Sequence, residues 1–403
     1  MNEVRAIVQA FENATAAGEK CALATIVSVE GSSYRRPGAK MLVTEDGTAT
    51  GSISAGCLEH DVIEHAKRVI HTGGIKLAVY DNASTSDEMA WGLGLGCNGV
   101  VRVLIEAIYE DSQYIAALQK SSEMRPDAPS IFAATVYEYV PATADSGNIS
   151  VGCRLFISEE GRVSFDGMDH DGPAIADAIQ MLIRSGAKLG EHSIDTETFE
   201  VKVFLEKLSP PVPLVIFGAG HDALPIVELA RSLGWQTEVI DPQARDASSA
   251  RFALADRITL VRPADIERRV AITPQTIALV MSHNYSDDIA CLKFLLTSSA
   301  RYIGVMGPRK RTERMLEELG TGDGAFQLEE HDLTRLHSPV GLDIGANSPV
   351  QVALSIVAEI QAVLEGRSGR MLCESRGPLN YVSHVNRSVD RTSASGRGFT
   401  VCE

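Results

Sequence analysis

Cys57 is the residue whose type and position most directly indicate chemistry. It lies in GSISAGCLEHD, residues 51–61, between Gly56 and a segment with helical spacing of apolar residues. At a helix N-terminus, unpaired amides and the positive end of the helix dipole stabilise a thiolate. Glu59 and His60 follow, where they could position or deprotonate the thiol. Free cysteines are more often buried core residues, but the loop-to-helix position favours a functional thiolate.

A second cysteine, Cys97, lies in the glycine-rich stretch GLGLGCNG and is the second candidate thiolate. The remaining cysteines fall in strand or helix patterns or in the C-terminal tail, and we expect them to be structural. Cys57, His60 and Cys97 could be assembled into a zinc site. However, the sequence lacks the closely paired ligands that zinc sites use, so zinc is disfavoured.

The stretch LVIFGAGHDALPIVELA predicts a glycine-rich turn between a strand and a helix, of the kind that binds phosphate. A short apolar strand runs into a GxGxxA motif that contains Gly218, Gly220 and His221, and an apolar helix follows. The glycines let the backbone approach a phosphate, and the helix N-terminus attracts it. Asp241 ends the next strand, where an acid can accept a hydrogen bond from a ribose. Asp222 argues against a bound dinucleotide, because its charge would lie beside the pyrophosphate.

Polar residues also follow two later strands of the same pattern. His283 and Asn284 come after the fourth strand, in MSHNYSDD, and Arg309 comes after the fifth, in GPRKR. In the strand order 3-2-1-4-5-6 the first and fourth strands flank the ligand crevice. We therefore expect His283 and Asn284 opposite the GxGxxA turn. The alternatives are that His283 simply caps the next helix with Ser286 and Asp287 and that Arg309 belongs to a solvated helix start.

A basic turn, GSSYRRPGAK, brings Arg35, Arg36 and Lys40 close together in the sequence. Such a cluster could bind phosphate bidentately. Basic turns are also common without a ligand, and these residues alone leave both interpretations open.

The elements that must position these residues fall into two patterns. Residues 22–56 predict short strands, and a helix is expected to begin at or just after Cys57. After Leu214, five apolar strands alternate with helical segments, and a last long helix begins near Pro349. The fold class is therefore α/β: an N-terminal α+β domain with a cysteine-bearing helix start, followed by a Rossmann-like doubly wound parallel sheet. We find no internal repeat in the sequence.

The stiff SPPVP segment is the clearest domain boundary. An N-terminal cysteine-motif domain is predicted at residues 1–112, and a middle α+β segment that could pack with it at residues 131–208. A Rossmann-like domain is predicted at residues 212–366, followed by a flexible tail at residues 367–403.

Composition limits the class of partner. The 403 residues carry a formal net charge of −16, which repels nucleic acid and anionic membranes. No apolar run is long enough to span a bilayer, and the N-terminus lacks the pattern of a secretory signal. Seven dispersed cysteines indicate free thiols in a reducing compartment. We expect a cytoplasmic protein.

The motifs, taken in this order, resemble the XdhC/CoxI family, the accessory factors of xanthine dehydrogenase and related molybdenum hydroxylases. The resemblance covers most of residues 1–366. It rests on the stretches GSSYRRPGAKML, GSISAGCLEHD, GLGLGCNG, FGAGH, SHNYSDD, YIGVMGPRKR and GLDIGANSPVQVALSIVAEI.

The resemblance implies a protein that binds the molybdenum cofactor, as molybdopterin or a nucleotide-extended form. It would assist sulfuration and insertion of that cofactor, as a carrier rather than an enzyme. The expected partners are an apo molybdenum hydroxylase, a cysteine desulfurase-type sulfur donor and a second copy in a homodimer. Cys57 would face molybdenum or its sulfur, and His221 and His283 the pterin phosphate. The alternative function is an NAD(P)-dependent oxidoreductase with His283 as acid/base.

Overall fold

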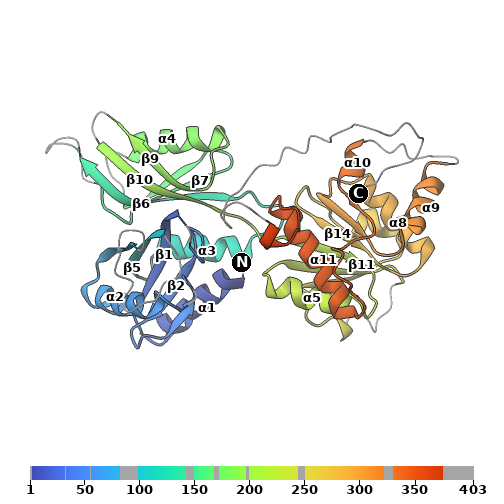
Figure 1. Cartoon of the computed structure of the whole chain (residues 1–403), viewed down its shortest axis with the longest axis horizontal. Coiled ribbons are helices and arrows are strands. Elements are labelled where there is room, and N and C mark those ends of the chain that lie inside the picture. The colour runs from blue at the N-terminus through green and yellow to red at the C-terminus, as the bar shows by residue number, and fades with distance from the viewer. Residues whose placement is uncertain are drawn as a thin grey trace. The chain divides into compact units, whose positions relative to one another are not determined.

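The computed structural model of the chain forms two compact units, one with residues 3–210 and one that begins at Pro211 (Figure 1). The boundary lies within the SPPVP segment. The structure describes residues 2–31, 33–54, 56–81, 99–141, 149–167, 172–196, 199–243, 250–321 and 330–374.

The first half of the first unit is an antiparallel sheet in the order β3-β2-β1-β5-β4. Side chains of the central strand alternate between two faces. Ala24 and Ile26 pack against α2, whereas Leu23 points to the opposite face. The elements are α1 (Asn2–Ala16), β1 (Cys21–Gly31), β2 (Lys40–Thr44), β3 (Ala49–Gly51), α2 (Glu59–Thr72), β4 (Ile75–Asp81) and β5 (Gly99–Ile108).

The second half is another antiparallel sheet, in the order β8-β7-β6-β10-β9. The predicted middle α+β segment, residues 131–208, contains the five strands and α4, whereas α3 lies before it and was not predicted. β9 has a single buried residue, Ile194, so its sequence shows no strand pattern. α4 covers the outer face of this sheet, as α2 does for the first (Figure 1). The elements are α3 (Gln113–Glu123), β6 (Ile131–Pro141), β7 (Arg154–Ser158), β8 (Val163–Asp166), α4 (Gly172–Arg184), β9 (Gly190–Asp195) and β10 (Phe199–Leu208).

The two halves have the same topology, which corrects the expectation of no internal repeat. Each runs helix, three strands, helix, two strands, and each sheet has the same strand order within its half. Val27 of β1 and Tyr137 of β6 are bulged residues at the same distance from their strand starts. Both are buried in one cluster with Leu104 and Phe204, between the two sheets. The first unit is therefore a structural duplication.

Two buried ion pairs link the two sheets at equivalent positions. The Nζ atom of Lys40, the first residue of β2, lies 2.7 Å from a carboxylate oxygen of Glu206 in β10. Arg154, the first residue of β7, binds both carboxylate oxygens of Glu106 in β5. The ring of Tyr114 lies 3.9 Å from the Arg154 guanidinium carbon, and its hydroxyl donates to Glu206. This exchange of partners between halves is the pattern of a pseudo-two-fold axis.

The second unit is a parallel sheet in the order β13-β12-β11-β14-β15-β16. Numbered within the unit, this is the predicted order 3-2-1-4-5-6. The five predicted strands are confirmed, and the two-residue β16 is added. The strands are β11 (Pro213–Phe217), β12 (Gln236–Asp241), β13 (Arg257–Leu260), β14 (Ile277–Val280), β15 (Tyr302–Val305) and β16 (Leu336–His337).

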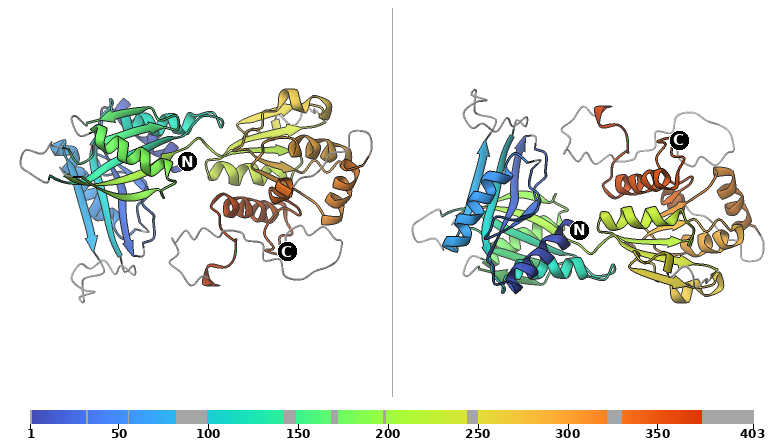
Figure 2. Two further views of the ribbon diagram at one scale, coloured as in Figure 1. Left: turned by 90° about the horizontal axis from the view of Figure 1, so that it is seen from above. Right: turned by 90° about the horizontal axis from the view of Figure 1, so that it is seen from below.

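Helices cover both faces of this sheet (Figure 2). α5 and α11 pack on one face, and α7, α8 and α9 pack on the other. The predicted last helix is confirmed: Pro349 is its first residue, and Ser348 and Gln351 form a capping box. The helices are α5 (Ala223–Ser232), α7 (Ile266–Arg269), α8 (Tyr285–Leu296), α9 (Arg309–Leu319), α10 (Glu330–Thr334) and α11 (Pro349–Leu364), with short 3-10 turns η1 (Pro263–Asp265) and η2 (Leu372–Glu374).

Within the part of the chain that the structure describes, no helix combines the length and apolar character needed to cross a membrane. Most of the predicted tail, residues 375–403, lies outside the described residues.

Candidate functional site

The loop between β3 and α2 carries Cys57. The helix begins at Glu59 with Leu58 as its N-cap, so the cysteine lies just before the cap. Its side chain is half-buried and packs against the apolar cluster under α2. Gly56 beside it is exposed, with a φ of 105° that favours glycine. The predicted loop-to-helix position is therefore confirmed, and the thiol lies at the edge of the core.

The Glu59 carboxylate fixes the shape of this loop. It accepts hydrogen bonds from the Ser52 hydroxyl at 3.0 Å, from the Ser54 amide at 2.8 Å and from the Gly56 amide at 3.0 Å. Partial burial favours a higher pKa, but hydrogen bonds from the Ser54 hydroxyl and amide outweigh it and hold the pKa of Glu59 below its usual range. A carboxylate held in this way is a poor base for Cys57. Of the two roles expected for Glu59, these hydrogen bonds support positioning.

Other candidates in the first unit differ in their surroundings. His60 is exposed on the first turn of α2. Lys40 is buried and paired with Glu206, which rules out the suggested phosphate contact. Cys97 lies outside the described residues.

The other described cysteines contrast with Cys57. All five described cysteines are free thiols. Burial raises the pKa of Cys21 to about 11 and that of Cys153 to about 12, and it also raises the pKa of Cys291. These three are buried structural residues, as expected, whereas Cys373 is exposed. Among the described cysteines, Cys57 alone combines partial exposure with a position beside a helix N-terminus.

In the second unit, the glycine turn after β11 has the predicted geometry. Gly218 has a φ of 141°, and a Cβ atom there would lie 2.4 Å from the Met281 carbonyl oxygen. Only glycine fits this close approach between the turn and the chain after β14. A Cβ atom on Gly220 would lie 3.5 Å from the His283 ring. The structure therefore places His283 against the turn, as the strand order predicts.

The charges at this turn do not suit a pyrophosphate. His283 Nε2 lies 3.1 Å from the Asp222 carboxylate, at the start of α5. Asn284 accepts hydrogen bonds from the Ser286 and Asp287 amides, so Asn284, and not the His283 weighed from the sequence, caps α8. A carboxylate at the phosphate position disfavours a dinucleotide.

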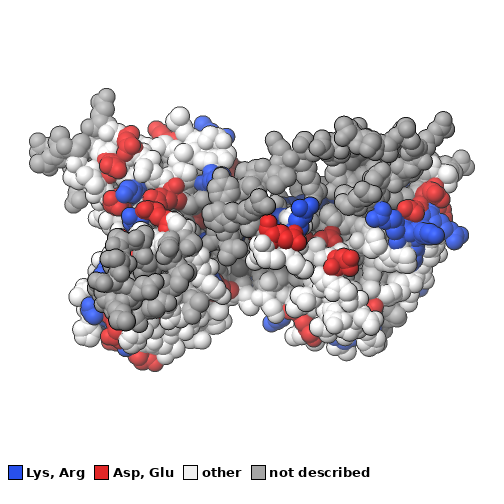
Figure 3. Space-filling view, in the orientation of Figure 1, with Lys and Arg blue, Asp and Glu red and all other residues white. Residues whose placement is uncertain are grey.

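The remaining second-unit candidates divide between exposed and buried positions. His221 is exposed in the turn, and Arg309 is exposed at the start of α9, where basic side chains gather (Figure 3). Asp241 is fully buried, and its carboxylate accepts from the Gln243 amide at 3.0 Å. This burial does not favour the predicted ribose contact of Asp241, which stays a prediction.

Sequence reasoning missed three residues that shape these sites. Glu3 bonds Arg35 and the Ser52 amide, and Ser54 accepts from the Leu58 amide at 3.1 Å. Arg251 donates to the Ala219 carbonyl at 2.9 Å. The serine before a helix start is a recognisable capping signal, whereas Glu3 and Arg251 act across long sequence separations that leave no local signal. No group of three potential metal ligands occurs among the residues that the structure describes.

Two family models match the chain. One, described as the XdhC and CoxI family, matches residues 14–81, and the other, described as the XdhC Rossmann domain, matches residues 214–360. A relative from Bacillus subtilis (strain 168), named as a probable xanthine dehydrogenase subunit, is 31% identical over 349 residues, which cover 85% of this chain and 92% of the relative. The chain belongs to the XdhC and CoxI family. The first match of this XdhC/CoxI protein includes Cys57, and the second includes the glycine turn.

Two further similarities extend over nearly the whole XdhC/CoxI chain. The molybdenum cofactor insertion chaperone PaoD of Escherichia coli (strain K12) is 22% identical over 362 residues, which cover 89% of this chain and 88% of that protein. A crystal structure described as a xanthine dehydrogenase from Bacillus halodurans is 31% identical, with a TM-score of 0.68, and the match covers 92% of this chain and 98% of that one.

Proposed function

We propose that this protein carries the molybdenum cofactor, as molybdopterin or a nucleotide-extended form. It would assist sulfuration of the cofactor and its insertion into a xanthine dehydrogenase-type molybdenum hydroxylase. The names of two relatives support this assignment, since one is an insertion chaperone and the other belongs to a probable xanthine dehydrogenase. The cofactor is cargo here, and Cys57 is the residue that faces its molybdenum or sulfur.

The observation that carries the proposal is the half-buried thiol of Cys57 in a loop held by Glu59. A soft thiolate suits molybdenum or its sulfur ligand better than a hard cation. A fixed loop presents the sulfur in one position before the cargo arrives, which lowers the ordering cost of the first contact. The exposed glycine beside Cys57 leaves room for a bulky ligand to approach.

The proposal includes partners. An apo hydroxylase receives the cargo, a cysteine desulfurase-type protein supplies sulfur, and a second copy of the chain forms a homodimer in the cytoplasm. The Asp222–His283 pair and the buried Asp241 disfavour the nicotinamide alternative.

The test is purification of the protein from cells that make the cofactor. The wild type, Cys57→Ser and the control Cys373→Ser are denatured and assayed for pterin fluorescence and molybdenum. Cys373 is exposed but lies outside the proposed site. We expect pterin with the wild type and the control, and loss of pterin or of metal in Cys57→Ser at an unchanged melting temperature. Equal cargo in all three proteins would remove Cys57 from the site, and absence of pterin from all three would refute the carrier function.

A further inference from the structure

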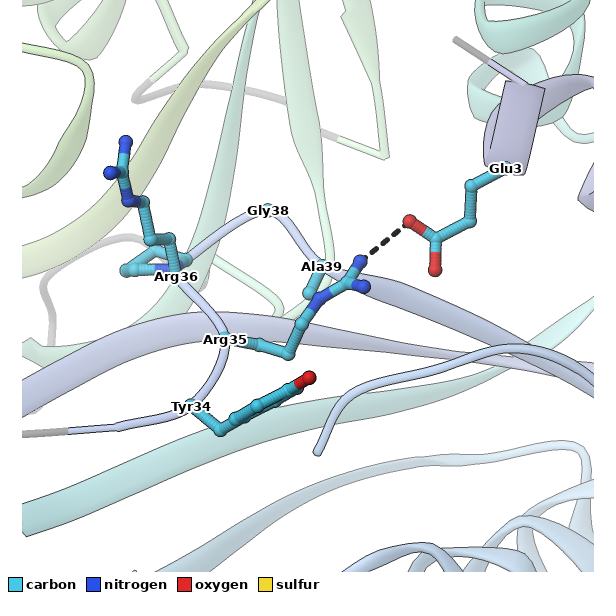
Figure 4. Close-up of a pocket in the computed structure, with 7 residues that line it drawn as sticks. Glu3, Tyr34, Arg35, Arg36, Gly38 and Ala39 are labelled. Atoms are coloured by element: carbon cyan, nitrogen blue, oxygen red, sulfur yellow. Dashed lines mark hydrogen bonds and ion pairs between the residues drawn. The ribbon is translucent and has the colours of Figure 1, made fainter. Parts of the chain in front are cut away.

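The turn between β1 and β2 forms a hollow of about 320 Å³ (Figure 4). Its walls include the carboxylate of Glu3 from α1 and the turn residues Tyr34, Arg35, Arg36, Pro37 and Gly38. Arg35 and Arg36 contribute two guanidinium groups to its lining, although the chain as a whole is strongly acidic. Guanidinium groups bind phosphate bidentately. The ring of Tyr34, 69% exposed, adds a flat wall and a hydroxyl group.

Arg35 is the residue through which this hollow connects to the cysteine loop. Its Nη2 atom lies 2.5 Å from Glu3 Oε2, and the two side chains are 31% and 36% exposed. Figure 4 shows the Arg35 side chain extending from the turn toward Glu3. The ion pair is therefore open to solvent, where an incoming anion can compete for the guanidinium group.

The second oxygen of Glu3 reaches the cysteine loop. Glu3 Oε1 accepts from the Ser52 amide at 3.1 Å, and the Ser52 hydroxyl donates to Glu59 at 3.0 Å. Glu59 in turn accepts from the amide of Gly56, next to Cys57. One carboxylate thus joins the arginine of the hollow to the loop that holds the thiol.

We propose that the Arg35 turn is the phosphate subsite of the cargo, and that Glu3 couples its occupancy to the cysteine loop. This inference rests on the proposed function. A phosphate that binds Arg35 displaces Glu3, the Ser52 amide loses its acceptor, and the loop around Cys57 loosens. The subsite replaces the expected phosphate contact of His221 and His283, where Asp222 opposes an anion.

The test uses the full chain with inorganic phosphate as the probe, against chloride at equal ionic strength. Calorimetry measures binding, and peptide mass spectrometry measures alkylation of Cys57 by iodoacetamide, with Cys373 as internal reference. In the wild type we expect saturable binding and faster alkylation of Cys57. Arg35→Gln should lose both responses. The control Arg162→Gln, which removes an exposed arginine paired with Glu160, should retain both.

Glu3→Gln separates binding from coupling. The amide keeps an oxygen for the Ser52 amide but no longer competes for Arg35. Phosphate should therefore bind up to about fivefold more tightly, the change expected for loss of an exposed ion pair. Alkylation of Cys57 should then no longer respond to phosphate. Unchanged binding in Arg35→Gln, or an undiminished alkylation response in Glu3→Gln, would overturn the inference.

Co-purification distinguishes failure of the phosphate-subsite inference from failure of the proposed carrier function. We expect Arg35→Gln to retain less pterin than the wild type from cofactor-producing cells. Pterin on the wild type together with no phosphate response overturns the subsite and leaves the carrier function standing. No pterin on the wild type overturns the carrier function itself, whatever the turn binds.

Discussion

Removal of one partner of the buried Arg154–Glu106 pair should severely destabilise the first unit. The two side chains are 4% and 7% exposed, and the guanidinium group also bonds Thr135 and the Gly152 carbonyl. Glu106→Gln leaves a full positive charge among buried groups. The expected loss is about 3–5 kcal/mol of unfolding free energy, the range found when one member of a buried ion pair is removed.

The matched control is Glu30→Gln. Glu30 also pairs with an arginine, Arg102, across neighbouring strands, but its side chain is 58% exposed. Loss of that pair should cost less than about 1 kcal/mol.

Urea unfolding is followed both by circular dichroism and by tryptophan fluorescence, in a Trp91→Phe background. This leaves Trp235 of the second unit as the single tryptophan. Glu106→Gln should shift the transition of the first unit and leave the Trp235 fluorescence transition unchanged. An effect of Glu106→Gln no larger than that of Glu30→Gln would refute the reasoning.

Three further predictions concern the glycine turn, the free thiols and Glu59. Gly218→Ala should lower the melting temperature of the second unit by several degrees, measured by Trp235 fluorescence, because the new Cβ atom would meet the Met281 carbonyl. In the native protein, iodoacetamide should label Cys57 and Cys373 far faster than the buried thiols, as read by peptide mass spectrometry; equal rates would contradict the assigned burial of Cys21, Cys153 and Cys291. The folded-state pKa of Glu59 is lowered, so its stabilisation is present above the unfolded-state pKa and disappears as pH falls through the folded-state value. The unfolding free energies of wild type and Glu59→Gln should therefore differ at pH 7 and converge in acid.

The parallel sheet of the second unit could be predicted from sequence because its strands are buried on both faces. Val215 and Ile216 point to opposite sides of β11, and both are buried. Such strands read as continuous apolar runs. β16 could not be predicted, because its two residues are too few to show a period.

The candidate site was predictable only where the signal was local. The position of Cys57 before a helix and the approach of His283 to the glycine turn follow from adjacent residues and from strand order. The burial of Lys40 depends on Glu206, which is remote in sequence, so the turn residues gave no indication of it. The burial of Asp241 gave no local signal for the same reason, because it is a tertiary property.

The duplicated topology of the first unit has an evolutionary consequence. A chain of half the length would expose the inner face of its sheet and one charge of each cross-sheet ion pair. Two such chains could cover both by forming a symmetric dimer, in which the Lys40–Glu206 and Arg154–Glu106 positions would be one contact made twice. Fusion of two such genes would preserve that contact. Only one of the two halves would then need to keep the residues used for chemistry. The seven residues before the helix are FDGMDHD in the second half and SISAGCL in the first. The first half thus carries the cysteine loop, whereas the second half supplies Glu206 and Arg154, which pair with the first half across the sheets.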